Sequence, residues 1–300
     1  MSNRSSNQAP VDVGVVVVHY GDQESTFRCV HAVVMDSSSA SRQVVVVDNS
    51  GNLEAGSLPG TTIHLSSADN PGFGEGANRG VRRLFEEVSP KHLLLLNHDV
   101  EILPGYLDSV LLALATPGVG AAGGPLFLDR RDGPLWYAGG GVNYLTGTVW
   151  QSRSPKEACR RRQVSFLPGA AIAITPAAWE EVRGFDPRFF LYNEDLDLCR
   201  RLRRAGWQLG FEPRLSAIHY LGAATGSREI SALYLEHLSA TRFLPFRSLL
   251  YRAYLGLAHS AYVSYRALFL AARLGLAGKS RVRALLRGHR RALCTIFRTP

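Results

Sequence analysis

Acidic and histidine side chains that could perform group-transfer chemistry occur at three places in the chain. Glu194 and Asp195 follow an aromatic run, where crowding and partial burial can raise the pKa of one carboxyl until it serves as a general base. Asp99 ends the triplet Asn97-His98-Asp99 directly after an apolar run, and a carboxylate there can bind a hard divalent cation that shares substrate phosphates. His219 could add a neutral imidazole to such a cation site.

Each of these groups also has a structural interpretation. Acids in the first turn of a helix complement its dipole, Asn and Asp are common turn formers, and a lone His is more often structural than a ligand. The glycine-rich residues 70–80 open a helix whose free N–H groups could face a phosphate, or they form only a tight turn into that helix. Their glycine spacing differs from the dinucleotide-binding fingerprint.

The elements that must position these residues follow an alternating pattern. Continuous apolar runs predict buried parallel strands, and helical segments lie between them. The predicted strands are 13–20, 43–48 and 92–96, and the predicted helices are 24–35, 75–88 and 104–115. This alternation indicates an α/β fold, in which ligands bind beyond the carboxyl ends of the strands. Polar residues stand at the carboxyl ends of all three strands, namely His19-Tyr20, Asp48-Asn49 and the triplet at 97–99.

The second half has a different pattern of shorter elements. We expect strands at 118–127, 164–174 (with a Pro-Gly interruption), 209–212 and 217–220. A loop or hairpin is expected at 136–150, a short helix at 176–183 and a strongly patterned helix at 194–205. After residue 226 the pattern is helical.

Composition limits the class of protein. The chain has 300 residues, 46% of them hydrophobic and 20% charged, which is typical of a folded protein with one large or two small domains. The four cysteines, at positions 29, 159, 199 and 294, show no metal-binding spacing and suit a reducing compartment. Residues 1–10 are polar and are expected to form a disordered leader rather than a signal peptide.

Positive charge is concentrated towards the C-terminus. The net charge is +9, and residues 233–300 contribute +11 from twelve Lys or Arg and one Glu, which leaves −2 for the rest. Such a segment attracts nucleic acid or acidic lipid. Because the body lacks a basic groove with interleaved aromatics, we expect no nucleic-acid partner. The tail then forms either helices on an anionic membrane surface or an ordinary helical subdomain with a solvated basic face.

The combined order of the motifs resembles the family 2 glycosyltransferases, above all their rhamnosyltransferase and galactofuranosyltransferase branch. The likeness spans about residues 13–226. Its segments are the strand ending in His-Tyr, the strand ending in Asp-Asn-Ser, the glycine-rich run, Leu-Leu-Asn-X-Asp-Val, Gly-Phe-Asp-X-X-Phe-Phe-X-Tyr-X-Glu-Asp-X-Asp-Leu-Cys-X-Arg and X-His-Tyr. The resemblance implies a GT-A fold, with a mixed, mostly parallel sheet flanked by helices, over residues 11–228. A basic helical region would follow at 229–300.

The same resemblance implies an activity and a set of site residues. The activity is inverting, metal-assisted transfer of a sugar, with rhamnose favoured, from a nucleotide-diphosphate donor to a hydroxyl of a glycan or polyprenyl-linked acceptor. Such an enzyme would be cytoplasmic and work at the inner face of the plasma membrane. Asp195 matches the catalytic base, Glu194 would orient the acceptor, and Asp99 with His219 would hold Mg²⁺ or Mn²⁺. The residues implied for nucleotide-sugar binding are Tyr20, Asp48, Asn49, Gly72, Asn78, Asn97 and His98.

Two departures from the family pattern stand out. Asn97 replaces the first acid of the Asp-X-Asp form, and His98 in the middle position either perturbs the metal site or contacts phosphate. Gly21 stands where the first motif usually has Asn after Tyr. The alternative to an enzyme is a catalytically inactive scaffold that binds nucleotide-sugars, and the intact Asp99, Asp195 and His219 argue against it. A nucleotidyltransferase is disfavoured because residues 13–26 lack a glycine-rich Arg/Lys signature.

Overall fold

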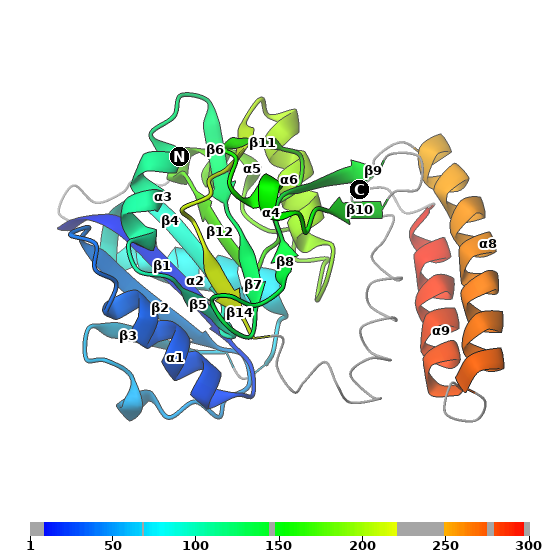
Figure 1. Ribbon diagram of the computed structural model, residues 1–300. Helices are drawn as coiled ribbons and strands as arrows, with labels where there is room; N and C mark the ends of the chain where they lie inside the picture. Colours follow the sequence, from blue (N-terminus) through cyan, green and yellow to red (C-terminus); the bar gives the residue numbers. More distant parts are fainter. Residues whose placement is uncertain (1–8, 68, 144–147, 221–248, 275–278, 297–300) are drawn as a thin grey trace.

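An eight-stranded sheet forms the centre of the molecule (Figure 1). The computed structural model describes residues 9–67, 69–143, 148–220, 249–274 and 279–296. The strand order of the sheet is β11-β13-β6-β12-β4-β1-β2-β3, and its pairs are mostly parallel. The architecture is therefore the expected α/β fold, with helices packed on a mixed sheet.

The first strands and helices alternate as the sequence predicts. They are β1 (Ala9–His19), α1 (Gln23–Val34), β2 (Arg42–Asp48), the short helix η1 (Ala55–Ser57), β3 (Thr62–Ser66), α2 (Phe73–Glu87), β4 (Val88–Asn97) and α3 (Tyr106–Leu114). β1 pairs in parallel with β2 and β4, and the valine and leucine runs of these strands are buried. The sequence pattern does not predict β3, because this edge strand is only partly buried and has no continuous apolar run.

Helix α2 approaches the sheet closely because glycines face it. A Cβ atom at Gly80 would lie 2.4 Å from Val16 Cγ1 and 2.9 Å from Val47 Cγ2. A Cβ atom at Gly76 would lie 2.9 Å from the Asn49 side chain. Gly76 and Gly80 therefore allow α2 to pack closely on β1 and β2, a role that the sequence analysis did not predict for them.

The two long strands predicted in the second half are each divided. Residues 118–127 form β6 (Val119–Gly123) and β7 (Leu126–Leu128), and residues 164–174 include the end of β11 (Arg162–Val164) and β12 (Ala171–Ile174). A Cβ atom at Gly124 would lie 2.2 Å from the Leu215 carbonyl oxygen, so only glycine allows the chain to pass here between two sheets. β12 runs antiparallel to both β4 and β6.

A smaller sheet of four strands, in the order β5-β14-β7-β8, extends the site region. Its other strands are β5 (Val100–Ile102), β14 (Ala217–His219) and β8 (Leu135–Tyr137). β9 (Gly140–Asn143) and β10 (Thr148–Gln151) pair antiparallel, so the hairpin interpretation of residues 136–150 is confirmed for the described strands. The remaining elements before residue 221 are α4 (Pro155–Ala158), α5 (Pro176–Val182), α6 (Glu194–Arg204) and β13 (Gln208–Phe211).

The C-terminal part contains two helices that pack against each other, α8 (Leu249–Leu274) and α9 (Lys279–Ile296) (Figure 1). Within the described ranges, no helix combines the length and apolar character needed to cross a bilayer. At the other end, β1 begins at Ala9, so Ala9 and Pro10 belong to a strand and not to the expected leader. The rest of that leader, residues 1–8, and the expected helical residues 229–248 lie outside the described residues.

Candidate active site

Polar side chains gather at the carboxyl ends of β1, β2 and β4, as the sequence predicts. The parallel register places His19 opposite Asp48, and Val18 opposite Asn97. His19 Nε2 lies 3.8 Å from Asp48 Oδ1, and the ring of His98 packs edge-on against the His19 ring with 5.8 Å between ring centres. Burial lowers the pKa of His98, against the opposing effect of the nearby Asp99 carboxylate. This edge of the sheet is the usual ligand-binding edge of α/β folds.

The four-stranded sheet brings Asp99 and His219 together. β14 pairs antiparallel with β5, so that His219 lies opposite Val100. The backbone N–H of Tyr220 donates to the Asp99 carbonyl oxygen at 2.9 Å. As a result, Asp99 Oδ1 lies 3.3 Å from His219 Nε2. Burial raises the pKa of Asp99, but His219, His98 and a backbone hydrogen bond together lower it by more, so the side chain is a carboxylate.

The donor atoms of Asp99 and His219 fit a divalent cation. Asp99 Oδ1 is buried without a hydrogen-bond partner, an unfavourable state that coordination would relieve. In the part of the chain that the structure describes, no group of three or more His, Cys, Asp or Glu side chains could hold an ion. The protein would therefore supply two ligands, and phosphate and water oxygens would supply the rest.

Glu194 and Asp195 open helix α6 after a tight turn. Tyr192 and Asn193 adopt φ angles of 68° and 65°, in the left-handed region that non-glycine residues seldom occupy. Asp195 accepts hydrogen bonds from the backbone N–H groups of Leu196 at 2.7 Å and Gly169 at 3.1 Å. These bonds orient a carboxylate that remains partly exposed.

Residues 169–170 join the two halves of the site. The Gly169 N–H binds Asp195, and the next carbonyl oxygen, that of Ala170, accepts from the Asn97 N–H at 2.9 Å. Asn97 is the last residue of β4, two positions before Asp99. Asp195 therefore lies at the same edge of the sheet as Asp99 and its neighbour His219. Sequence reasoning did not identify Gly169, although the Pro-Gly interruption in residues 164–174 is the signal that could have found it.

Glu194 is the more buried acid of the pair. Its side chain is 7% exposed, and Oε2 has no hydrogen-bond partner. Burial, with a further contribution from the Asp195 charge, raises the pKa of Glu194 to about 8. Burial also raises the pKa of Asp195, against the backbone hydrogen bonds from Gly169 and Leu196. Of the two carboxyls, Glu194 is therefore the one that is protonated at neutral pH.

The variant Glu194→Gln should lose a pH dependence of stability. The folded-state pKa of about 8 exceeds the unfolded value of about 4.3, so the native state binds more protons between these values. The free energy of unfolding of the wild type therefore falls as pH rises through this window. Between pH 5 and pH 8, the free energy of unfolding of the variant, relative to that of the wild type, should rise by at least about 1.4 kcal/mol, which corresponds to one pKa unit. Urea unfolding measures this shift, and parallel pH profiles would contradict a buried, protonated Glu194.

The glycine-rich loop is tied to the segment that precedes α6. Gly72 has a φ of +88°, and the N–H of Phe73 donates to the Phe190 carbonyl oxygen at 3.3 Å. The Asn49 Nδ2 donates to the Gly72 carbonyl oxygen at 3.0 Å. Asn78 holds Phe185 from both sides, because its Nδ2 donates to the Phe185 carbonyl oxygen and its Oδ1 accepts from the Phe185 N–H, each at 2.9 Å. The glycine-rich loop thus holds in place the segment of chain that leads into Glu194 and Asp195.

Substitution of Gly72 by alanine should disrupt this connection. A Cβ atom at position 72 would lie 2.0 Å from the Phe190 carbonyl oxygen, and the positive φ adds strain. We expect Gly72→Ala to lower the free energy of unfolding by about 2 kcal/mol or more. Gly56→Ala is the matched control, because nothing lies within 4 Å of its Cβ position and its φ is not positive. Equal urea midpoints for the two variants would refute the tight contact.

Two other residues predicted for donor binding differ in whether their side chains are already engaged by hydrogen bonds or exposed to solvent. Asp48 accepts hydrogen bonds from the N–H groups of Gly51, Ser50 and Leu53 at 2.7, 2.9 and 3.0 Å. Burial raises the pKa of Asp48, but these backbone hydrogen bonds lower it by more, so the group is a carboxylate that shapes the loop after β2. Tyr20, by contrast, is 57% exposed.

A hydrogen-bond network around His19 escaped sequence reasoning. His19 Nδ1 lies 2.6 Å from Thr26 Oγ1, and His19 Nε2 lies 2.9 Å from Asn52 Oδ1. Asn52 Nδ2 also donates to the Gly21 carbonyl oxygen at 2.9 Å. These partners come from α1 and from the loops after β1 and β2, so no spacing in the sequence could have indicated them.

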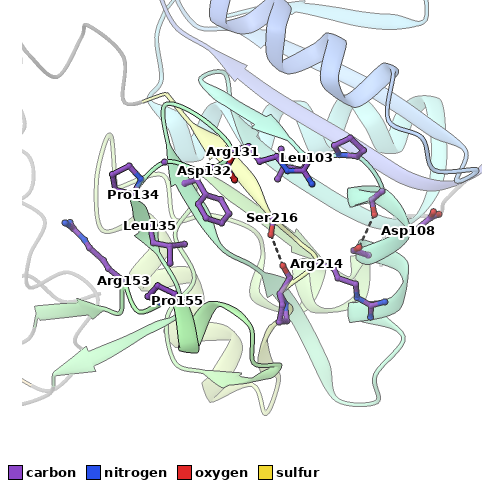
Figure 2. A pocket seen from close by; sticks show the side chains of 16 residues that line it. Leu103, Asp108, Arg131, Asp132, Pro134, Leu135, Arg153, Pro155, Arg214 and Ser216 are labelled. Carbon is purple, nitrogen blue, oxygen red and sulfur yellow. Dashed lines mark hydrogen bonds between the residues drawn. The ribbon is translucent and has the colours of Figure 1, made fainter.

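A pocket of about 970 Å³ is lined by residues outside this site (Figure 2). Leu103, just after β5, and Ser216, just before β14, line it, whereas Asp99 and His219 lie at the opposite ends of these strands. None of the predicted site residues lines the pocket.

Comparison with known proteins identifies the family. The family description "Glycosyltransferase like family 2" matches residues 9–233. An N-acetylglucosaminyl-diphospho-decaprenol L-rhamnosyltransferase of Mycobacterium tuberculosis is 31% identical over 206 residues, which cover 61% of this chain and 66% of that protein, slightly under two thirds of its length. The low-salt glycan biosynthesis hexosyltransferase Agl10 of Haloferax volcanii is 25% identical over 218 residues, or 69% of this chain and 67% of that protein.

Solved structures agree on the fold. The mannosyltransferase PcManGT of Pyrobaculum calidifontis, solved with GDP-Man and Mn²⁺, superposes with a TM-score of 0.54 at 16% identity, over 97% of this chain and 89% of its own. GalNAc-T7, solved with UDP, GalNAc and Mn²⁺, gives a TM-score of 0.57 at 14% identity, over 80% of this chain and 52% of its own. These likenesses show the GT-A fold. With the family match over most of its length, the chain belongs to the family 2 glycosyltransferases.

Proposed function

We propose that this protein catalyses inverting, metal-assisted transfer of a sugar from a nucleotide-diphosphate donor to an acceptor hydroxyl. The observation that carries the proposal is the shared sheet edge. There, a carboxylate–imidazole pair with buried unpartnered atoms lies beside a carboxyl that two backbone N–H groups orient. In an α/β fold, the carboxylate–imidazole pair suits a metal ion that binds the donor phosphates, and the oriented carboxyl suits removal of a proton from the acceptor.

In the proposed donor site, Asp99 and His219 would hold Mg²⁺ or Mn²⁺. When bound, the cation offsets the negative charge that develops on the departing diphosphate. Asn97 and His98 precede Asp99 on the same edge, and the neutral His98 ring offers a hydrogen bond to a phosphate oxygen. Exposed Tyr20 and the loop that Asp48 shapes provide the surface for the nucleoside. Asn49, Gly72 and Asn78 contribute indirectly, because their hydrogen bonds hold the glycine-rich loop in place.

Asp195 is the proposed general base. It removes the proton of the acceptor hydroxyl as that oxygen attacks the anomeric carbon from the face opposite the diphosphate, which inverts the anomeric centre. One carboxylate is sufficient, because no glycosyl-enzyme intermediate has to be hydrolysed. The raised pKa of Asp195 increases its basicity, while the protonated Glu194 positions the acceptor by a hydrogen bond.

Rhamnose is the favoured sugar, and a lipid-linked glycan is the favoured acceptor. The support is the Mycobacterium tuberculosis relative, whose name specifies rhamnosyl transfer to a diphospho-decaprenol-linked sugar. We place the reaction on the cytoplasmic side, at the inner face of the membrane that carries such an acceptor. All four cysteines are free, as a reducing compartment requires. Residues 11–228 would form the catalytic domain, and residues 229–300 a separate basic helical region.

A panel of donors tests this proposal. The full-length protein is mixed with Mn²⁺ and, in turn, with nucleotide-diphosphate sugars that include rhamnose, galactofuranose, mannose and N-acetylglucosamine donors. A polyprenyl-diphosphate-linked sugar serves as acceptor. We expect the highest turnover with the rhamnose donor, an inverted product linkage and no turnover in EDTA. Donor binding without any transfer or donor hydrolysis across the whole panel would instead indicate an inactive scaffold.

A further inference from the structure

Helix α8 presents a row of six exposed residues at the spacing of a coiled coil. The row consists of Leu250, Tyr254, Leu257, Ala261, Ser264 and Leu268. Successive members are four or three residues apart in strict alternation, which is the repeat through which two helices of a coiled coil pack. We call these six residues the seam. Its three leucines are 84%, 77% and 72% exposed, so no described residue covers the seam.

The seam faces directly away from α9. Leu255 of α8 packs with Ala292 of α9, and Val263 of α8 packs with Leu285 of α9. At 3.6 residues per turn, these two positions of α8 lie on the side of the helix opposite the seam. Helix α9 therefore leaves the whole seam open to a second helix.

The exposed area of the seam is large enough for a specific interface. Tyr254 of the seam is 44% exposed, and Tyr265 beside it is 65% exposed. With about 200 Å² for each fully exposed large side chain, these tyrosines and the three leucines expose about 700 Å² per chain. Two copies would together remove up to about 1,400 Å² from water, which lies within the ~1,200–2,000 Å² that specific protein interfaces bury.

An antiparallel pair of seams matches large residues with small ones. In one register, Leu257 of each copy lies opposite Ala261 of the other, Tyr254 lies opposite Ser264, and the terminal leucines of the seam meet each other. A parallel pair would place tyrosine against tyrosine and alanine against alanine, which crowds one layer and leaves a void in the next. Ser264 tolerates burial, because its hydroxyl already donates to the Ser260 carbonyl oxygen at 2.9 Å.

We propose that the seam is a dimerisation surface, on which α8 of a second copy of this chain packs antiparallel. The residues at the flanking positions of the seven-residue repeat agree with this role. They are Tyr251, Ala253, Ala258, Ser260, Tyr265 and Ala267. None of them carries a charge that would repel the second copy, and the alanines let the two helices approach closely.

The arginines of α9 do not oppose this pairing. Arg283, Arg287 and Arg290 are exposed, on the side of α9 that faces away from α8. In the proposed dimer, each α9 lies on the outer side of its own α8. Because packed helices are about 8–10 Å apart, the arginines of the two copies are more than about 20 Å apart. At physiological salt this separation exceeds the Debye length of about 8 Å, so their repulsion is screened.

An anionic bilayer is the competing occupant of the seam. Helices that lie on a bilayer surface are rich in Lys or Arg beside their apolar face, where these side chains reach the headgroups. The flanking positions of the seam contain neither residue, and the arginines of α9 face the opposite way. A second copy requires no countercharge, and is therefore the better match.

Sedimentation equilibrium of the full-length protein tests the proposal. We expect the wild type to be a dimer at micromolar concentration. Leu257→Gln/Leu268→Gln should raise the dissociation constant at least about 10³-fold, because four leucines per dimer lose their burial. Leu112→Gln removes an exposed leucine from α3, and Arg283→Gln/Arg290→Gln removes two arginines from the far side of α9. Both controls should remain dimeric, and circular dichroism checks that every variant folds.

Disulfide cross-linking tests the antiparallel register. The exposed cysteines are first removed by Cys159→Ser/Cys294→Ser. In this background, Tyr254→Cys/Ser264→Cys should form a covalent dimer on oxidation with copper phenanthroline. The two positions are about 15 Å apart along one helix, too far for a disulfide within a chain. Ser264→Cys alone should not cross-link, because its two copies would also be about 15 Å apart in the antiparallel pair. A covalent dimer of this single variant would overturn the register.

A monomeric wild type, or a dimer that Leu257→Gln/Leu268→Gln leaves unchanged, overturns the proposal. Co-sedimentation with vesicles of phosphatidylcholine and phosphatidylglycerol then identifies the bilayer as occupant if the monomer binds them and this variant does not. The sedimentation assay contains neither donor nor acceptor, so its outcome is independent of the proposed sugar transfer.

Discussion

The variant Asp195→Asn should lose sugar transfer while it still binds the donor. An amide cannot take the proton of the acceptor hydroxyl, and a positioned general base typically contributes about 10²–10⁴-fold to the rate. We therefore expect kcat to fall by about 10³-fold, with donor affinity in Mn²⁺ within about twofold of wild type, because Asp195 is placed on the acceptor side. Initial rates at saturating donor and acceptor, together with donor titration calorimetry, measure the two effects.

The stability of this variant has to be measured alongside its rate. The two carboxylate oxygens of Asp195 accept hydrogen bonds from the N–H groups of Gly169 and Leu196. An amide has only one accepting oxygen, so the variant can keep only one of these two bonds in its present geometry. Loss of one of these bonds would cost about 1–3 kcal/mol of unfolding free energy. Asp132→Asn, at an exposed position, is the matched surface control. A folded Asp195→Asn protein with near wild-type kcat would eliminate Asp195 as the base.

The second large effect is expected at the paired ligands. Asp99→Asn and His219→Asn each remove one of the two side chains that would hold the cation, so each should reduce transfer by about 10³-fold, several kcal/mol of transition-state stabilisation. More telling, their donor affinity should no longer respond to replacement of Mn²⁺ by EDTA, whereas that of the wild type should fall. Donor titrations in Mn²⁺ and in EDTA make the comparison directly.

The control for this prediction is a histidine of the same type at a remote position. His31→Asn lies on the exposed surface of α1 and should keep both activity and the response to EDTA. Because the proposed site uses Asp99 and His219 for one ion, the double variant should be little worse than either single variant. Additive losses, or a wild-type donor affinity that ignores EDTA, would count against a shared metal site.

Much of the central sheet could be predicted because its signals are local. The valine and leucine runs of β1, β2 and β4 are buried on both faces, so each run announces a parallel strand without reference to its neighbours. The edge strand β3 and the short β5 lack such runs, since their stability comes from pairing with β2 and β14. Long-range pairing leaves little trace in a five-residue or three-residue segment.

The candidate residues of the site could also be predicted from the sequence, but the hydrogen bonds and packing contacts that join them could not. The order of polar residues after apolar runs indicated Asp99, Asp195 and His219 as candidates. Nothing in their separation along the chain indicates that Gly169 and Ala170 lie between Asp195 and Asn97, or that Trp136 packs edge-on against the His219 ring with 4.8 Å between ring centres. The sequence also does not show that the side chains of Asn78 and Asp48 form their hydrogen bonds with backbone groups of the protein.

By itself, the sequence determined the α/β class, the family and the basic character of the C-terminal helices, because apolar runs, motif order and charge are properties of contiguous residues. Only the tertiary structure decided which carboxyl holds a proton, since the pKa of Glu194 depends on its burial and on the charge of its neighbour. Likewise, only the packing of α8 on α9 showed that the leucine face of α8 points outward while Arg252 is buried. A helical pattern shows that two faces differ, but the partner helix decides which face is turned to the surroundings.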